Sequence, residues 1–429
     1  MALSDDAIVV SGIGLVTPLG IGADEAWRAF AALESGIRSP ADPGPTDEQP
    51  PGPALRAGRA GYVRGFRAKS WITSAQLRRM DWCSRMAVAA ARQAMSDARA
   101  LPLAGERREE TALVVGSCYG NQRETEQFLQ RVFASGGGAA PPLIFPNLVL
   151  NAPAAYAAIE LEVQGPNLTV SQGEASGEAA LATAIDVLQA GAASLVCAGG
   201  VDEFGSVYLE ALRDRRVLDP DSLPDEERER ARAGRRGLRG GVVPGEGAAM
   251  LVIERAADAR ARGARCYAEI ECARVVSVPA GPYGFPRDVD SAAERLLSIV
   301  EDDTPIDAVI GGADGSPARA ALDRAVLRAV AGRQAQAPAY APFRRLSGEW
   351  GAAGALGVAI AALAIDRRCL PDMPRSPGEA LPRQASSREA PHGEEREPRR
   401  VLVVGAARSG VLAPVVLRQG NERSSTSRP

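Results

Sequence analysis

Short runs of β-branched or other apolar residues recur along the chain and predict buried β-strands. The runs are Ala7–Val10, Ala112–Val115, Leu168–Val170, Ser194–Ala198, Ala249–Ile253, Ala268–Ile270, Ala308–Ile310 and Val401–Val404. Ala-rich segments with a helical period follow several of them. These segments are Ser84–Ala98, Gly177–Ala190, Ala318–Ala331 and Gly354–Ile365. Strands that are apolar without alternation and that alternate with helices favour an α/β fold whose strands are covered on both faces.

The order of these elements predicts two similar halves. A strand, a Gly-rich turn, a long helix and a returning strand occur twice, with the seam between Arg255 and Gly263. We therefore expect an N-terminal half over 1–256 and a C-terminal half over 257–420. Polar segments without periodicity interrupt this pattern. We expect the charged stretch 214–239 to be a solvated helix or loop, 371–399 to be mobile and 421–429 to be a disordered tail.

The composition and the motifs that are missing argue against several classes of function. The formal net charge of −3 and the sequence pI of about 5.6 give no basic surface for nucleic acid. The single lysine, Lys69, follows Ala68, so the Gly-Lys-Ser/Thr of a phosphate-binding loop is missing. The six cysteines form no C-x-x-C pair, which argues against structural zinc and a disulfide framework.

Targeting signals are also missing from the sequence. The first residues hold no basic segment before an apolar core, and the uncharged, Gly- and Ala-rich stretch Trp350–Ile365 is shorter than the roughly 20 residues of a membrane span. We therefore expect a cytoplasmic protein without a membrane partner. Near the N-terminus, Gly12 and Gly14 follow a strand, but the third glycine of a dinucleotide-binding loop is replaced by Thr17.

The segment Val9–Gly20 closely resembles the opening of the β-ketoacyl-ACP synthases, and further landmarks of that family follow in order. They are Arg79-Met80-Asp81, Val114–Ser117, Phe145-Pro146-Asn147, Gly165-Pro166-Asn167, Ala198-Gly199-Gly200, Arg239 with Gly245–Ala248, and Gly351–Gly354. The resemblance implies the thiolase fold, with five layers α-β-α-β-α built from two similar halves. It also implies where catalytic residues should stand.

The condensing reaction of this family uses a cysteine thiolate at a helix N-terminus and two histidines. By the resemblance, the cysteine position falls on Glu174, the two histidine positions on Gly312 and Glu349, and the family's lysine on Arg344. The only histidine of the chain is His392, within the polar segment 371–399. The Phe-bearing, Gly-rich gate of active members is replaced by Val403–Gly410.

Such losses are typical of chain-length factors, the silent members of the family. The resemblance therefore implies a subunit of a type II polyketide or fatty-acid synthase that forms a heterodimer with an active ketosynthase. Family members pair through the strand at 168–170 and the helix after it. The chain itself would bind no cofactor, and the acyl chain would arrive on the phosphopantetheine of an acyl carrier protein.

Two other interpretations stay open. Glu174 could simply be a charged cap of the helix that follows it. Alternatively Glu174, Glu349 and Asp314 could converge and raise one another's pKa unless a cation such as Arg344 or Arg239 pairs with them. Such carboxylates would permit an independent malonyl- or acyl-ACP decarboxylase or hydrolase.

A third possibility is a homodimeric scaffold without an acyl role. We expect Cys118 and Cys197 to be small core residues. We expect Arg239 and Glu246 to be structural partners in loops.

Overall fold

The computed structural model describes residues 3–39, 58–223, 241–300, 304–373 and 396–420. Its centre is an 11-stranded sheet in the order β12-β11-β13-β15-β9-β1-β8-β7-β5-β6, with β2 paired to β1. The strands of the N-terminal part are β1 (Ile8–Thr17), β2 (Gly20–Ile21), β5 (Thr111–Gly116), β6 (Asn167–Val170), β7 (Leu195–Asp202) and β8 (Gly247–Arg255). Those of the C-terminal part are β9 (Ala268–Ala273), β11 (Ala308–Ile310), β12 (Ala339–Tyr340), β13 (Arg400–Val403) and β15 (Val415–Arg418).

The two parts have the same strand order and the same strand directions. β5 is parallel to β6 and β7, and β11 is parallel to β12 and β13, while the remaining pairs within each part are antiparallel. The edges of the two parts join where Val9 and Val10 of β1 pair with Glu269 and Ala268 of β9. The predicted architecture of two similar halves is thus confirmed, whereas the boundary after residue 256 stays a prediction.

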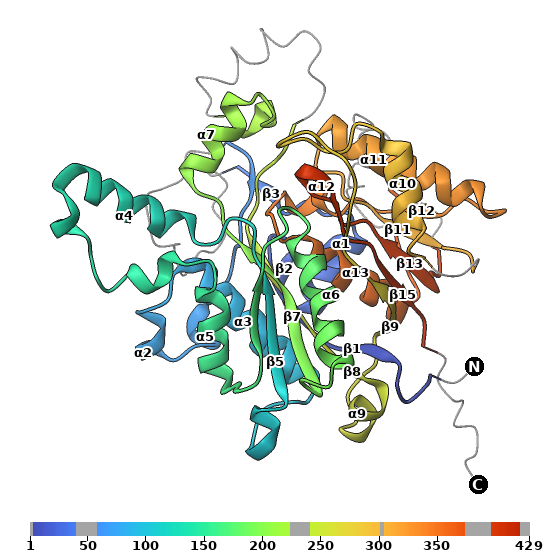
Figure 1. The fold of residues 1–429 in the computed structure, drawn as a ribbon, viewed down its shortest axis with the longest axis horizontal. Helices are drawn as coiled ribbons and strands as arrows, with labels where there is room; N and C mark the ends of the chain where they lie inside the picture. The colour runs from blue at the N-terminus through green and yellow to red at the C-terminus, as the bar shows by residue number, and fades with distance from the viewer. Residues whose placement is uncertain (1–2, 40–57, 224–240, 301–303, 374–395, 421–429) are drawn as a thin grey trace, which may run out of the picture.

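Helices cover both faces of each half-sheet and produce five layers (Figure 1). α3 (Trp82–Asp97) and α5 (Ala152–Leu161) lie on the outside of the N-terminal half. α6 (Ser176–Gln189) and α13 (Gly354–Arg367) fill the middle, and α10 (Val289–Leu297) and α11 (Pro317–Gly332) cover the outside of the C-terminal half.

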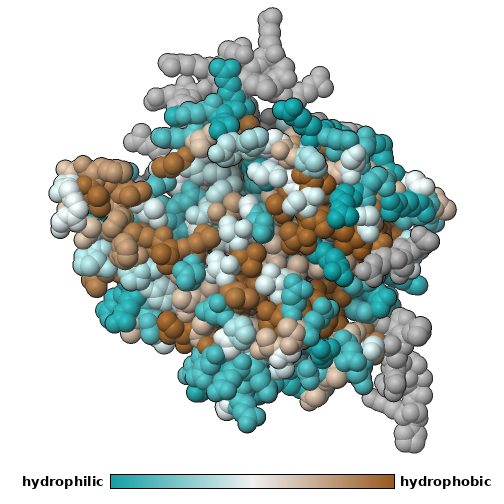
Figure 2. Space-filling view, in the orientation of Figure 1, coloured by the Kyte–Doolittle hydropathy of each residue, from teal (hydrophilic) through white to brown (hydrophobic). Residues whose placement is uncertain are grey.

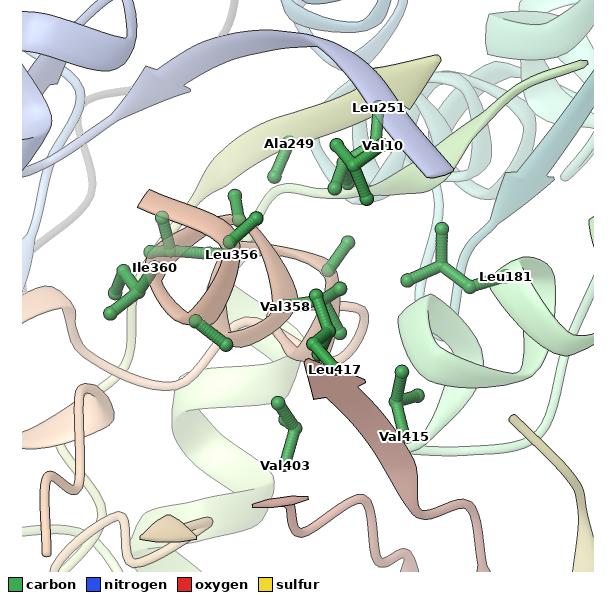
Figure 3. Close-up of a cluster of buried hydrophobic side chains, with 14 of the residues drawn as sticks. Val10, Leu181, Ala249, Leu251, Leu356, Val358, Ile360, Val403, Val415 and Leu417 are labelled. Carbon is green, nitrogen blue, oxygen red and sulfur yellow. The ribbon is translucent and has the colours of Figure 1, made fainter. Parts of the chain in front are cut away.

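The middle layer is the main core. Leu181 of α6 and Val358 of α13 lie between strands of both halves, which contribute Val10 and Val415 among others (Figure 3). These side chains are buried, and each fully buried residue of this size contributes about 1.5–3 kcal/mol to folding. The continuous apolar pattern in β1, β5, β7 and β8 is explained, because these strands are buried along nearly their whole length.

The remaining elements are short or peripheral. The helices are α1 (Ala23–Ala31), α2 (Ser74–Leu77), α4 (Gln122–Ser135), α7 (Ser206–Asp214), α9 (Ala256–Ala261) and α12 (Arg344–Ser347). Two small ribbons pair β3 (Ile37–Arg38) with β4 (Ala60–Gly61), and β10 (Val276–Ser277) with β14 (Val411–Leu412). Among the described helices, none is both long and apolar enough to cross a bilayer.

The glycines after the first predicted strand have a packing role. β1 continues through Gly12 and Gly14 as far as Thr17, and α3 lies directly on it. A Cβ atom at Gly12 would overlap the carbonyl of Ala94, and one at Gly14 would overlap the carbonyl of Ala90. The two glycines therefore allow helix and strand to approach closely.

The polar segments lie only partly within the described residues. Of the charged stretch 214–239, α7 ends at Asp214 and Leu218 pairs with Val242, whereas 224–239, including Arg239, lies outside the described residues. Of the segment 371–399, the ends are held by a backbone bridge between Leu370 and Arg396, and 374–395, including His392, lies outside. The tail 421–429 lies outside as well.

Candidate functional site

A tight turn before α6 positions Glu174. Gly173 adopts a positive φ of 59°, and the Ser176 hydroxyl donates to the Gly173 carbonyl (2.6 Å) and accepts the Gln172 N–H (2.9 Å). Glu174 is only 3% exposed. Its carboxylate accepts the backbone N–H of Arg408 (3.0 Å) and forms an ion pair with the Arg408 guanidinium. The N-cap residue of α6 is Ala175, which makes no side-chain capping hydrogen bond. The interpretation of Glu174 as a charged cap of this helix stays a prediction.

Arg408 belongs to the segment that replaces the gate of active family members. It lies between β13 and β14, and its guanidinium carbon is 5.3 Å from the centre of the Phe285 ring. The guanidinium of Arg319 lies at the same distance from that ring. The segment is therefore held against Glu174 by charge and against Phe285 by cation–π contacts.

Glu349 lies at the centre of a second, fully buried cluster. Its Oε2 accepts Arg319 Nη1 (2.6 Å) and lies 2.7 Å from Arg344 Nε. Arg319 also donates to Asp314 (3.3 Å) and to the Ala406 carbonyl (2.7 Å). Burial raises the pKa of Glu349, and the two guanidinium groups oppose that rise. For Arg319, burial acts to lower the pKa, but Glu349 and Asp314 outweigh it and raise the pKa.

A further carboxylate, Glu178, stands in the first turn of α6. It is fully buried against Gly354, and burial raises its pKa despite Arg344, whose Nη2 lies 4.0 Å from Oε1. Burial, followed by repulsion from Arg319, lowers the pKa of Arg344. The sequence analysis missed Glu178, although a single acidic residue early in an Ala-rich helix was a usable signal.

Gly312 stands where the resemblance places the first histidine, and arginine side chains fill the space beside it. Its N–H donates to Asp323 (3.1 Å). A Cβ atom built on Gly312 would lie 3.2 Å from the Val404 carbonyl oxygen, 3.3 Å from Arg319 Nε and 3.7 Å from Arg344 Nη1. The site has no room for an imidazole unless these guanidinium groups move.

The predicted convergence of the carboxylates is thus only partly reproduced. Asp314 and Glu349 meet at Arg319, whereas Glu174 binds Arg408. Of the two cations expected to pair with them, Arg344 contacts Glu349 and Arg239 lies outside the described residues. The sequence analysis missed Arg319 and Arg408, and because nearly every cation of the chain is an arginine, no local signal distinguished them.

The other singled-out residues are structural. Glu246 is buried and accepts Arg123 (2.5 Å) and the Val63 N–H (3.2 Å). Cys197 is fully buried within β7. Cys118 follows β5 and is half-buried, and burial raises the pKa of its thiol, so it is not a preformed thiolate. Within the described residues, no group of three acidic, histidine or cysteine side chains is arranged to hold a metal ion.

Comparison with known proteins agrees with this architecture. Residues 5–259 match the family described as "Beta-ketoacyl synthase, N-terminal domain". The chain belongs to the β-ketoacyl synthase family. A 3-oxoacyl-[acyl-carrier-protein] synthase 2 of Vibrio cholerae is 27% identical over 277 residues, which is 62% of this chain and 62% of that protein. The match therefore spans less than two thirds of that relative's length.

Solved structures extend the likeness to nearly the whole chain. The ishigamide ketosynthase/chain length factor superposes with a TM-score of 0.78 at 24% identity, over 97% of this chain and all of the other. A type II polyketide synthase complex, AntDE with the acyl carrier protein AntF, gives 0.75 at 20% identity, again over 97% and 100%. At these identities the likeness establishes the thiolase-like ketosynthase fold.

Proposed function

We propose that this chain is a non-catalytic, chain-length-factor-like subunit that pairs with an active ketosynthase in the cytoplasm. It would help to shape the cavity that holds the growing acyl chain, which an acyl carrier protein delivers on its phosphopantetheine. One observation carries the proposal. The positions matched to the catalytic cysteine and histidines hold Glu174, Gly312 and Glu349. The half-buried Arg408 pairs with Glu174, and the buried Arg319 and Arg344 contact Glu349 and fill the space beside Gly312.

This arrangement disfavours an independent decarboxylase or hydrolase. A general base must reach its substrate and accept a proton. The carboxylate of Glu174 is bound instead by the guanidinium and the backbone N–H of Arg408. Glu349 is bound by Arg319 and contacts Arg344, deep in the core. Neither carboxylate is available to a substrate without breaking its ion pair.

One face of the chain is suited to a partner. β6 is the last strand of the sheet, and its first two residues are exposed. Eight of the ten exposed large hydrophobic side chains among the described residues lie between residues 129 and 207, on α4, the segment after it, α5, β6 and α7. Figure 2 shows hydrophobic side chains gathered over α4. Exposed apolar side chains that gather in one region mark protein interfaces, and an obligate interface buries about 2,000 Å² or more.

The test is co-purification with an active ketosynthase encoded beside this chain. Leu168→Lys places a charge on β6, where the leucine is 39% exposed, and should abolish co-purification. Val275→Lys is the matched control, because that valine is 40% exposed but lies in the C-terminal half, away from β6. A wild-type chain that remains a homodimer and binds no ketosynthase would favour the scaffold interpretation.

A second experiment addresses Glu174. Malonyl-ACP turnover is measured for wild type and Glu174→Gln, each with an intact partner and with a partner whose cysteine is replaced. We expect turnover to require the partner's cysteine and to survive Glu174→Gln. Turnover that persists without that cysteine and falls about 10²–10⁴-fold in Glu174→Gln would establish an independent decarboxylase instead.

A further inference from the structure

A groove of about 460 Å³ opens beside α4. This volume lies within the roughly 300–1,000 Å³ of small-molecule pockets. α4 supplies Leu129 and Phe133, the segment before α5 supplies Leu148 and Leu150, and α7 supplies Val207. Leu129, Phe133 and Val207 are largely exposed in the isolated chain, so the groove is open on that side.

The polar residues in the lining are engaged by the protein itself. The Gln122 amide donates to the Glu203 carbonyl (2.9 Å) and accepts the Gly205 N–H (3.1 Å). The Glu126 carboxylate accepts the Ser206 hydroxyl and the Val207 N–H (2.9 Å). These two side chains therefore attach α4 to the segment that leads into α7.

The same holds at the beginning of α4. The Asn121 amide donates to the Asn147 carbonyl (3.1 Å) and accepts the Glu124 N–H (3.1 Å), and the Thr125 hydroxyl donates to the Asn121 carbonyl (2.6 Å). Gln130 lies at the exposed rim. An oxygen atom carried by a ligand would lose its hydrogen bonds to water on entering the groove. The side chains of Asn121, Gln122, Thr125 and Glu126 already have hydrogen-bond partners within the protein, so they compensate this loss poorly.

The inner end of the groove is aromatic. Tyr119 lines it, its ring centre lies 4.5 Å from that of Tyr208, and its hydroxyl donates to the Tyr208 hydroxyl (3.4 Å). Burial, followed by the carboxylate of Glu349, raises the pKa of Tyr208.

We infer that this groove takes a hydrocarbon acyl chain, saturated or polyene, and discriminates against a chain with carbonyl oxygens on alternate carbons. The inference rests on the proposed function, because it names the class of acyl chain that the paired subunits would hold. The two subunits together would close the groove, and its apolar lining would remove methylene or vinylene groups from water.

The experiment compares two uncharged probes of equal chain length, the N-acetylcysteamine thioesters of decanoic acid and of 3,6,9-trioxadecanoic acid. Binding is measured by calorimetry to the full chain, alone and in complex with the ketosynthase. We expect the decanoyl probe to bind at least about tenfold more tightly, because buried ether oxygens lack donors. Equal affinities, tighter binding of the trioxa probe or no binding of either probe would overturn the inference.

Matched variants locate the binding. Leu150→Trp fills the groove and should abolish the preference for the decanoyl probe, whereas Leu143→Trp, at a residue that is 89% exposed and outside the lining, should retain it. A preference that survives Leu150→Trp would overturn the assignment to this groove. Co-purification is scored separately. A complex that forms without the preference refutes only the acyl-chain class, and a preference without a complex refutes only the subunit role.

Discussion

Replacing Arg319 with methionine should destabilise the protein more than replacing any exposed arginine of the same helix. Methionine keeps a long apolar side chain but removes the cation. Arg319 is 1% exposed and binds Glu349, Asp314 and the Ala406 carbonyl. Removing one partner of a buried ion pair leaves an uncompensated charge and costs about 3–5 kcal/mol.

The matched control is Arg328→Met, also on α11. Arg328 forms an ion pair with Asp290 at 2.6 Å, the same distance as Arg319 to Glu349, but its side chain is 62% exposed and that of Asp290 is 75% exposed. Exposed pairs contribute at most about 1 kcal/mol. An unfolding entropy of about 2.1 cal/mol/K per residue gives about 0.9 kcal/mol/K for this length. The expected fall in Tm is therefore about 3–6 °C for Arg319→Met and about 1 °C or less for Arg328→Met.

The pH dependence of the destabilisation by Arg319→Met provides a second test of the same reasoning. Burial raises the pKa of Glu349 in the folded protein above its ordinary value. A carboxyl group with a raised folded pKa contributes stability that is present at low pH and is lost as pH rises through that pKa. Without Arg319 the pKa of Glu349 should rise further, so the penalty should be larger at pH 7 than at pH 5. Thermal unfolding followed by circular dichroism at pH 5 and pH 7 measures the fall in Tm of each variant. An equal fall in Tm for the two variants, or a fall in Tm for Arg319→Met that does not change with pH, would refute the reasoning.

Three further predictions follow from other described residues. Incubation with acyl-ACP should leave Cys118 without an acyl adduct in mass spectrometry, because burial raises the pKa of its thiol; an adduct would contradict this. Gly312→His should lower the free energy of unfolding by about 1–3 kcal/mol, because it overpacks the core, and should therefore lower Tm. Gly332→His, at a position with open space around it, should not lower Tm in this way. Burial raises the pKa of Asp81 to about 6, above about 3.9 in an unfolded chain. Wild type should therefore lose stability as pH rises from about 4 through 6, and Asp81→Asn, which keeps an acceptor for the Ser84 N–H, should lack this loss in a Tm series.

The fold was largely predictable because its signals are local. Continuous apolar runs mark strands that are covered on both faces, and all eight predicted strands are present. β15 (Val415–Arg418) was missed, since four residues next to a polar tail give a weak pattern, and α10 was missed because its apolar stripe is short. The arrangement of the strands in each half is not local, and it came from the resemblance to a known family.

The site was less predictable, because ion pairs depend on tertiary structure. The sequence analysis named Glu174, Glu349 and Arg344 from the order of family landmarks. It did not find that Arg319, 30 positions before Glu349 in the chain, or Arg408, 234 positions after Glu174, would be their partners. Strand and helix periodicity fixes which face of an element is buried. It does not fix which buried charge meets which.

The buried charges have a structural role that fits a silent subunit. Glu174 and Glu178 belong to the N-terminal half, and the arginines nearest to them, Arg408 and Arg344, belong to the C-terminal half. Glu349 of the C-terminal half exchanges backbone hydrogen bonds with the segment before β8, from its N–H to the Val243 carbonyl (2.8 Å) and from the Gly245 N–H to its carbonyl (2.7 Å). Ion pairs and backbone hydrogen bonds across this junction therefore link the two halves. Breaking one pair is costly, but replacing a whole buried network with apolar residues can be neutral. We therefore expect the network to fix the register of the two halves more than to add net stability.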